Sequence, residues 1–154
     1  MFHIVDDDEY VRAFMAEVIG LLGYACKAFA CPTSYLEYTN SSDFEKPYAL
    51  LTDVQMPKMN GYELLDQVKR LHPEIRTAVI SGFSEYEGEA KARSCAFLSK
   101  PVDVEKLEHL LKSFVSCSED GPNPKKYGCG KDGSSRELGV NKWQCPHGQR
   151  CRCC

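Results

Sequence analysis

The sequence predicts an α/β fold in which a doubly wound, five-stranded parallel sheet carries helices on both faces, followed by a small irregular tail. Across residues 2–115, short apolar runs alternate with segments whose apolar residues recur every three or four positions. The runs are typical of buried strands, and the recurring pattern is typical of amphipathic helices. Parallel strands need crossover connections, usually helices, so this alternation favours a parallel sheet.

Each element of the first half has a local signal. Residues 2–5 form a short run that is apolar apart from His3, which predicts the first strand. A helix is expected over residues 11–22 because its apolar residues share one helical face, and Gly23 is suited to the position just past a helix end. Residues 24–30 are the second predicted strand, and Pro32 fits the first turn of a short helix.

The second half continues the alternation. Residues 49–52 are the third predicted strand, and the helix after the next loop is expected to end at His72-Pro73, because a residue before proline disfavours helix. The inward face of that helix is formed by Leu64, Leu65, Val68 and Leu71. A strand at 77–80, a helix at 85–93 with few large apolar residues and a strand at 96–98 follow. The last predicted helix has apolar residues at helical spacing, namely Val104, Leu107, Leu110, Leu111 and Phe114.

Composition restricts the class of protein. With 154 residues, 43% hydrophobic and 27% charged, the chain fits one globular domain and an appendage. No apolar stretch approaches the roughly 20 residues that span a bilayer, and an acidic triplet follows the first strand where a signal peptide would be apolar. We therefore expect a cytoplasmic protein without a membrane partner.

Charge and cysteine content divide the chain into a domain at 1–116 and a tail at 117–154. The domain has 12 Lys+Arg against 18 Asp+Glu, a net charge of −6, whereas the tail has 7 against 4, a net charge of +3. An acidic domain argues against nucleic-acid binding, and the tail shows no helix-turn-helix pattern. The three domain cysteines, Cys26, Cys31 and Cys95, are interpreted as small buried apolar residues.

The tail cysteines suit a metal site better than disulfides if the protein is cytosolic. Together with one histidine they exceed the four soft ligands that structural zinc requires, although their spacing is not that of a paired Cys-x-x-Cys site. Two alternatives stay open: a disordered basic tail whose cysteines have no particular role, and a tail that contacts nucleic acid through its basic residues. Those residues are Lys125, Lys126, Lys131, Arg136, Lys142, Arg150 and Arg152. The candidate zinc ligands are Cys129, Cys145, His147, Cys151, Cys153 and Cys154.

Charged side chains follow three of the predicted strands. Asp6-Asp7-Asp8 comes after the first, Asp53 after the third and Lys100 after the fifth. The carboxyl ends of parallel strands meet at one crevice, where such folds bind ligands. Carboxylates gathered there would repel one another without a cation, and oxygen ligands of this kind suit Mg²⁺. For Asp6 and Asp7 the simpler alternative is helix capping.

Four motifs lie at predicted strand ends. They are Val5-Asp6-Asp7-Asp8 with Arg12 in the following helix, Thr52-Asp53 with Met56-Pro57-Lys58-Met59-Asn60-Gly61, Ile80-Ser81-Gly82, and Phe97-Leu98-Ser99-Lys100-Pro101. Together they resemble the receiver domain of two-component response regulators, over about residues 2–115. The resemblance implies the flavodoxin-like strand order 2-1-3-4-5 and a cis peptide bond between Lys100 and Pro101.

The resemblance also implies a role for each matching residue. Asp53 would be the phospho-accepting nucleophile, and Asp8 lies outside the acidic pair that the family uses. The other implied roles are Asp7 as direct Mg²⁺ ligand, Asp6 as its neighbour acting through water, Gln55 as a ligand through its backbone carbonyl, Lys100 as the neutralising cation, Ser81 as the hydroxyl that bonds the phosphoryl group, and Phe97 as the switch aromatic.

The implied function is signalling rather than metabolic catalysis. A sensor histidine kinase or phosphotransfer protein would donate the phosphoryl group, and the chain would catalyse only its own phosphoryl transfer and slow dephosphorylation. Phosphorylation would then remodel the face formed by the fourth and fifth helices and fifth strand for a downstream protein target, and homodimer formation stays open. Two features modify this expectation: the segment from Ser81 to Phe97 is about three residues shorter than in typical receivers, nearly one helical turn, and Phe83 is a candidate shield of the acyl phosphate.

Two rival functions use the same fold signals. A haloacid dehalogenase-type phosphatase would use Asp6 as nucleophile and Asp8 as acid/base, but Tyr10 does not fit its motif and Asp53 would have no role. A flavin-binding protein of the flavodoxin type would share the strand order. A crevice lined with carboxylates would repel the flavin phosphate, which argues against it.

Overall fold

The computed structural model describes residues 1–82 and 93–119, with side chains up to residue 115. It contains a five-stranded, all-parallel sheet in the order β2-β1-β3-β4-β5, which confirms the predicted fold class. The strands are β1 (Phe2–Val5), β2 (Cys26–Phe29), β3 (Ala49–Asp53), β4 (Arg76–Ser81) and β5 (Ala96–Ser99).

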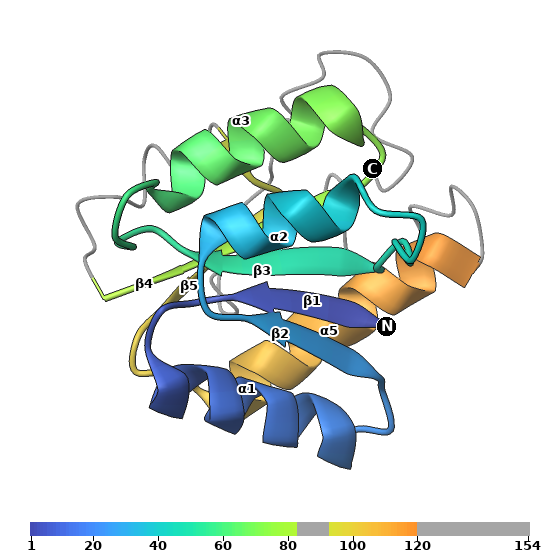
Figure 1. Cartoon of the computed structure of the whole chain (residues 1–154). Helices are drawn as coiled ribbons and strands as arrows, with labels where there is room; N and C mark the ends of the chain where they lie inside the picture. Colours follow the sequence, from blue (N-terminus) through green and yellow to red (C-terminus); the bar gives the residue numbers. More distant parts are fainter. Residues whose placement is uncertain (83–92, 120–154) are drawn as a thin grey trace.

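Helices cover both faces of the sheet (Figure 1). The described helices are α1 (Glu9–Leu21), α2 (Pro32–Thr39), α3 (Gly61–Leu71) and α5 (Val104–Glu119). In Figure 1, α2 and α3 lie above the sheet and α1 and α5 below it, while β1 and β3 end on the left. Most of the helix predicted at 85–93, most of the shortened segment from Ser81 to Phe97, and Phe83 itself fall on residues 83–92, outside the described part of the chain.

Local sequence explains where the helices begin. Asp8 caps α1, since its carboxylate accepts hydrogen bonds from the backbone N–H of Tyr10 (2.8 Å) and Val11 (3.2 Å). Asn60 and Glu63 form a reciprocal capping box at the start of α3. Past the end of α1, Gly23 has φ +82°, the left-handed conformation that glycine tolerates and that was expected there.

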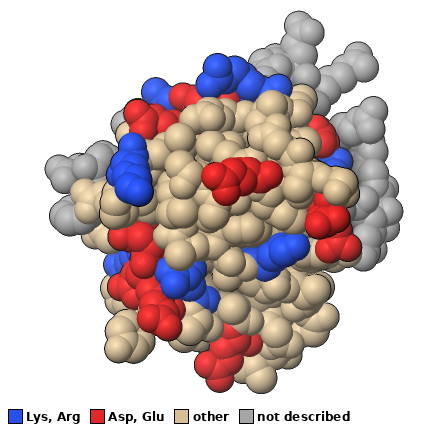
Figure 2. Space-filling view, viewed as in Figure 1, with Lys and Arg blue, Asp and Glu red and all other residues tan. Residues whose placement is uncertain are grey.

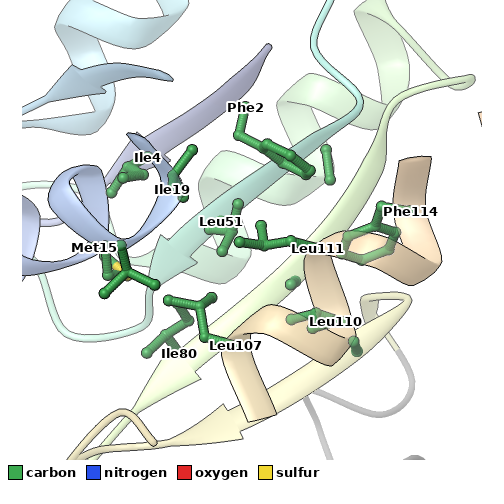
Figure 3. Packing of buried hydrophobic residues seen from close by; sticks show 14 of the residues in the cluster. Phe2, Ile4, Met15, Ile19, Leu51, Ile80, Leu107, Leu110, Leu111 and Phe114 are labelled. Atoms are coloured by element: carbon green, nitrogen blue, oxygen red, sulfur yellow. The ribbon is translucent and has the colours of Figure 1, made fainter. Parts of the chain in front are cut away.

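The sheet separates two hydrophobic cores. Successive side chains of a strand point to opposite faces, so Phe2 and Ile4 pack towards α1 and α5 while Val5 packs towards α2 and α3. Figure 3 shows the first core, in which Leu51 lies beside Leu111 of α5. Covering both faces is what a parallel sheet requires, and it leaves the carboxyl ends of the strands as the exposed edge.

The inward position predicted for Leu71 is wrong, and Val104, for which only helical spacing was predicted, is exposed as well. Leu71 is 48% exposed and Val104 is 47% exposed, although both fit the helical spacing of their neighbours. Each is the terminal residue of its helix. The packed face begins further inside the helix, so spacing alone does not bury an end residue.

The distribution of charge on the described surface bears on whether the domain can bind nucleic acid. On the described part of the face in Figure 2, basic and acidic side chains are interspersed, without a broad patch of one sign. Among the residues that the structure describes, no helix combines the length and the apolar character needed to cross a bilayer.

Candidate functional site

The ends of three strands bring together the residues that the sequence singled out. Asp6 follows β1, Asp53 ends β3 and Lys100 follows β5. The backbone fixes each of them: Asp6 N–H donates to the Phe29 carbonyl (3.2 Å), and Lys100 N–H donates to the Ser81 carbonyl (2.8 Å). The Lys100-Pro101 peptide bond is cis, as the resemblance implies. These side chains therefore converge because of strand order and register.

Lys100 links the two buried carboxylates. Its Nζ lies 2.9 Å from Asp6 Oδ2 and 3.3 Å from Asp53 Oδ2. Asp6 is fully buried and Asp53 is 7% exposed. The exposed Asp7 completes the group, because one carboxylate oxygen from each of Asp6, Asp7 and Asp53 lies within 4.8 Å of the others. The cluster thus combines the ammonium group of Lys100 with three carboxylates.

This donor set fits a divalent cation that prefers oxygen. Three carboxylates at such spacing can share one ion, and oxygen-only ligands favour Mg²⁺ over zinc or copper. Without a cation the cluster has an excess of negative charge in a partly buried place, which is costly. The chemistry of the site therefore agrees with the Mg²⁺ expected from the sequence.

Burial and charge shift the pKa values of the central pair in the same direction. Burial raises the pKa of Asp53; Lys100 opposes this rise, and Asp6 adds to it. For Lys100, burial alone would lower the pKa, but hydrogen bonds and Coulomb attraction from Asp6 and Asp53 outweigh it, so its pKa is raised. Lys100 stays an ammonium beside Asp53.

The backbone around Asp53 is held closely. Its Oδ1 accepts a hydrogen bond from Val54 N–H at 2.7 Å, and its carbonyl accepts one from the Thr52 hydroxyl at 3.0 Å. Gly61 N–H donates to the Val54 carbonyl at 2.9 Å. A Cβ at Gly61 would lie 2.0 Å from the Asp53 carbonyl oxygen, so only glycine fits there.

Two neighbours, Asp8 and Arg12, fix the acidic loop after β1 through hydrogen bonds that the sequence did not predict. Asp8 N–H donates to Asp6 Oδ1 (2.9 Å), and an Arg12 guanidinium N–H donates to the Asp6 carbonyl (2.7 Å). Helix capping, considered for Asp6 and Asp7, belongs to Asp8 instead. An N-cap preference directly before Glu9 was the available signal for Asp8.

The other candidate residues lie around this cluster. Ser81 is buried at the end of β4, the neighbour of β3, and Phe97 is half-buried on β5 against the core of α2 and α3. Gln55 is exposed in the loop after β3. Their roles in metal binding and switching stay predictions. The six candidate zinc ligands of the tail fall outside the described residues.

The three domain cysteines were expected to be buried, but none of them is fully buried; Cys26 and Cys95 still pack against the first core, whereas Cys31 lies apart from it. It is half-buried at the N-cap of α2, and its sulfur lies 3.3 Å from the Ser34 hydroxyl and 3.2 Å from the Thr33 hydroxyl. Hydrogen bonds with Ser34 and then with Thr33 lower the pKa of Cys31 to about 7, whereas burial raises the pKa of Cys26 to about 11.

This contrast predicts selective alkylation, because the thiolate is the reactive form. Iodoacetamide should modify Cys31 with a rate that rises through about pH 7, while Cys26 stays unreacted until far more alkaline pH. Peptide mass spectrometry of a pH series measures both sites in one sample. Ser34→Ala should move the Cys31 profile to higher pH; equal rates at the two cysteines would contradict the prediction.

Comparison with known proteins identifies the family of this constellation. The family model described as "Response regulator receiver domain" matches residues 2–112. The transcriptional regulator NtrC of Escherichia coli K12 is 27% identical over 125 residues, covering 79% of this chain and 26% of NtrC. FixJ of Rhizobium meliloti is 30% identical over 125 residues, covering 77% of this chain and 60% of FixJ. The chain thus spans about a quarter of NtrC.

Solved structures share the fold. The receiver domain of NtrX from Brucella abortus superposes with a TM-score of 0.68 at 24% identity, covering 75% of this chain and 98% of that domain. The chemotaxis response regulator CheY4 of Vibrio cholerae gives 0.64 at 23% identity, covering 73% and 96%. With the family model matching most of the chain, and with the acids and the lysine in the places that this family's motifs predict, the chain belongs to the response regulator receiver domain family.

Proposed function

We propose that Asp53 accepts the phosphoryl group from the phosphohistidine of a sensor histidine kinase or phosphotransfer protein. The observation that carries this proposal is the convergence of the Asp6, Asp7 and Asp53 carboxylates within 4.8 Å, with Lys100 in contact with both buried acids. Asp53 is the member of the cluster that ends the central strand, and the backbone N–H of the next residue, Val54, holds its carboxylate. It is therefore the carboxylate best fixed for attack.

The chain's own groups would hold the cation. The carboxylates of Asp6, Asp7 and Asp53 and the Gln55 carbonyl would bind Mg²⁺, which supplies charge neutralisation for the phosphoryl oxygens. Asp6 is buried and accepts from Asp8 N–H, so its orientation is set before any ligand arrives. Such preorganisation lowers the cost of reorganising charge during the reaction.

The transfer itself needs only a fixed carboxylate and balanced charge. An Asp53 oxygen attacks phosphorus, the bond from phosphorus to the histidine nitrogen breaks, and that nitrogen keeps the electron pair. The product is an acyl phosphate. Val54 N–H holds Oδ1 while Lys100 faces Oδ2, where it opposes the negative charge that builds on the phosphoryl group. The chain acts on itself, through this transfer and a slow dephosphorylation.

Output follows from the same edge of the sheet. Ser81 would move to bond the phosphoryl group, and Phe97, whose half-buried ring packs against the second core, would turn inward to fill the space that Ser81 leaves. This would bias an existing equilibrium of the face around β5 and α5 and so change its affinity for a downstream protein. We place the protein in the cytoplasm, with homodimer formation open, and the tail cysteines remain candidate zinc ligands.

The haloacid dehalogenase alternative is not supported. It needs Asp8 as an acid/base facing a substrate, but the Asp8 carboxylate accepts two backbone hydrogen bonds as the cap of α1. It also needs Asp6 as an accessible nucleophile, and Asp6 is fully buried against Lys100. The family match disfavours it as well.

Acetyl phosphate with Mg²⁺ tests the proposal without a partner kinase. We expect the wild-type chain to gain one phosphoryl group, which peptide mass spectrometry after borohydride reduction places on Asp53. Asp53→Asn should abolish labelling because an amide cannot form the acyl phosphate. Asp43→Asn, in an exposed loop, is the matched control and should label normally. Phosphate on Asp6, or undiminished labelling of Asp53→Asn, would overturn the proposal.

A further inference from the structure

The carboxylate of Asp7 is placed by its backbone alone. Asp7 is exposed, yet one of its oxygens lies within 4.8 Å of ligand oxygens from Asp6 and Asp53. With the described residues it forms no hydrogen bond or ion pair of its own. The position of this candidate metal ligand therefore depends on how the main chain is held at Asp6 and Asp8, its two neighbours.

Arg12 holds the main chain on both sides of Asp7. Its guanidinium donates to the Asp6 carbonyl at 2.7 Å, and its backbone N–H donates to the Asp8 carbonyl at 3.0 Å as the first bond of α1. Asp8 adds to this clamp by capping α1. The half-buried side chain of Arg12 thus reaches back over one helical turn, so that Arg12 is hydrogen-bonded to the main chain both before and after Asp7.

From these contacts we infer that Arg12 is a positioning residue for the cation site: its hydrogen bond to the Asp6 carbonyl sets the backbone that presents Asp7. The inference rests on the proposed function for the identity of the cation. Arg12 would contact neither the cation nor the phosphoryl group. It acts through Asp6 and Asp7, as partners behind metal ligands commonly do.

Charge and geometry make opposite predictions for Arg12. If only its positive charge mattered, removing it would reduce repulsion of the incoming cation and tighten Mg²⁺ binding. If its hydrogen bond matters, removal frees the loop and weakens binding. Loss of a partner behind a metal ligand typically costs about 10- to 100-fold in affinity. The sign of the change therefore separates the two roles.

Isothermal titration of the full chain with Mg²⁺, in the absence of any phosphodonor, measures this directly. We expect Arg12→Met, which keeps the apolar stem, to raise the dissociation constant about 10-fold or more. Arg12→Lys should also bind weakly, because lysine keeps the charge but lacks the planar fork and reach of arginine. Phosphorylation by acetyl phosphate should show a raised Mg²⁺ requirement, with the rate recovered at saturating Mg²⁺.

Arg76→Met is the matched control. Arg76 also donates to a backbone carbonyl, that of Phe114 at 2.8 Å, and it joins β4 to α5. Its replacement should lower stability in urea without changing Mg²⁺ affinity. Unchanged or tighter Mg²⁺ binding by Arg12→Met, full rescue by Arg12→Lys, or an equal loss of affinity in Arg76→Met would overturn the inference.

The outcomes also separate this inference from the proposed function. Phosphorylation of wild-type Asp53 together with normal Mg²⁺ binding by Arg12→Met would remove the inference and leave the function. Weakened Mg²⁺ binding by Arg12→Met in a chain that never labels Asp53 would support the inference and remove the function. A wild-type chain that binds no Mg²⁺ would overturn both.

Discussion

Gly61→Ala is expected to slow phosphorylation strongly, because Gly61 packs directly against the backbone of the nucleophile Asp53. The added Cβ would lie 2.0 Å from the Asp53 carbonyl oxygen, 2.9 Å from its carbonyl carbon and 3.0 Å from Val54 Cα. All three atoms belong to the backbone, so no side chain can rotate away. Either α3 must shift outward or β3 must move. Overpacking of this kind typically costs about 1–3 kcal/mol.

The larger effect is expected on phosphorylation. Movement of β3 displaces Asp53, and movement of α3 breaks the Gly61 N–H bond to the Val54 carbonyl (2.9 Å), next to the group that orients Asp53 Oδ1. A displacement of about 1 Å can cost on the order of 100-fold in rate. The initial rate of labelling by acetyl phosphate at saturating Mg²⁺ measures it.

Gly20→Ala provides the control for introducing alanine. Gly20 lies in α1, and a Cβ there meets nothing within 4 Å. Alanine is favoured over glycine in a helix by about 1 kcal/mol, so this variant should be slightly more stable and should label at the wild-type rate. Equal labelling rates for Gly61→Ala and Gly20→Ala would show that the close approach of α3 to β3 does not position Asp53.

The position of the site was accessible from the sequence because the rule behind it is topological. Asp6, Asp53 and Lys100 each follow an apolar run, and parallel strands necessarily present such residues at one edge. What holds the site was less accessible. Gly61 is eight positions from Asp53 along the chain, and its contact with that residue depends on how α3 lies over β3, which periodicity does not encode. Arg12 belonged to a recognised motif, but its hydrogen bond to Asp6 required coordinates.

The aromatic environment of His3 also could not be predicted from the periodicity of the sequence. His3 is the polar residue of β1, and its ring is fully buried and surrounded by aromatic side chains. The alternation of β1 sends His3 to the face of α2, and the chain after that helix closes over it. The surrounding rings are Phe29, Tyr35, Tyr38 and Phe44, with centroids at 6.1, 5.6, 5.6 and 6.2 Å from that of His3.

This environment predicts a loss of stability in mild acid. His3 Nδ1 lies 3.2 Å from the Tyr35 hydroxyl, and Nε2 has no hydrogen-bond partner in the described structure. Burial, then Lys27 and then the amino terminus lower the pKa of His3 to about 4. Below the ordinary histidine pKa of 6.5, the unfolded chain binds a proton that the folded chain does not, so the folded state loses stability as the pH falls towards about 4.

The shift corresponds to about 3 kcal/mol at roughly 1.4 kcal/mol for each pKa unit. Urea unfolding across this pH range should therefore show wild type losing about that much more stability than the double variant His3→Leu/Tyr35→Phe, which leaves no hydroxyl unpaired. Both proteins keep the same carboxylates, so their difference isolates His3. Tyr35→Phe alone keeps the His3 imidazole and should therefore still lose stability steeply as the pH falls. If the double variant weakens in acid as much as wild type, then His3 takes up its proton in the folded state, and the aromatic enclosure between β1 and α2 does not exclude charge.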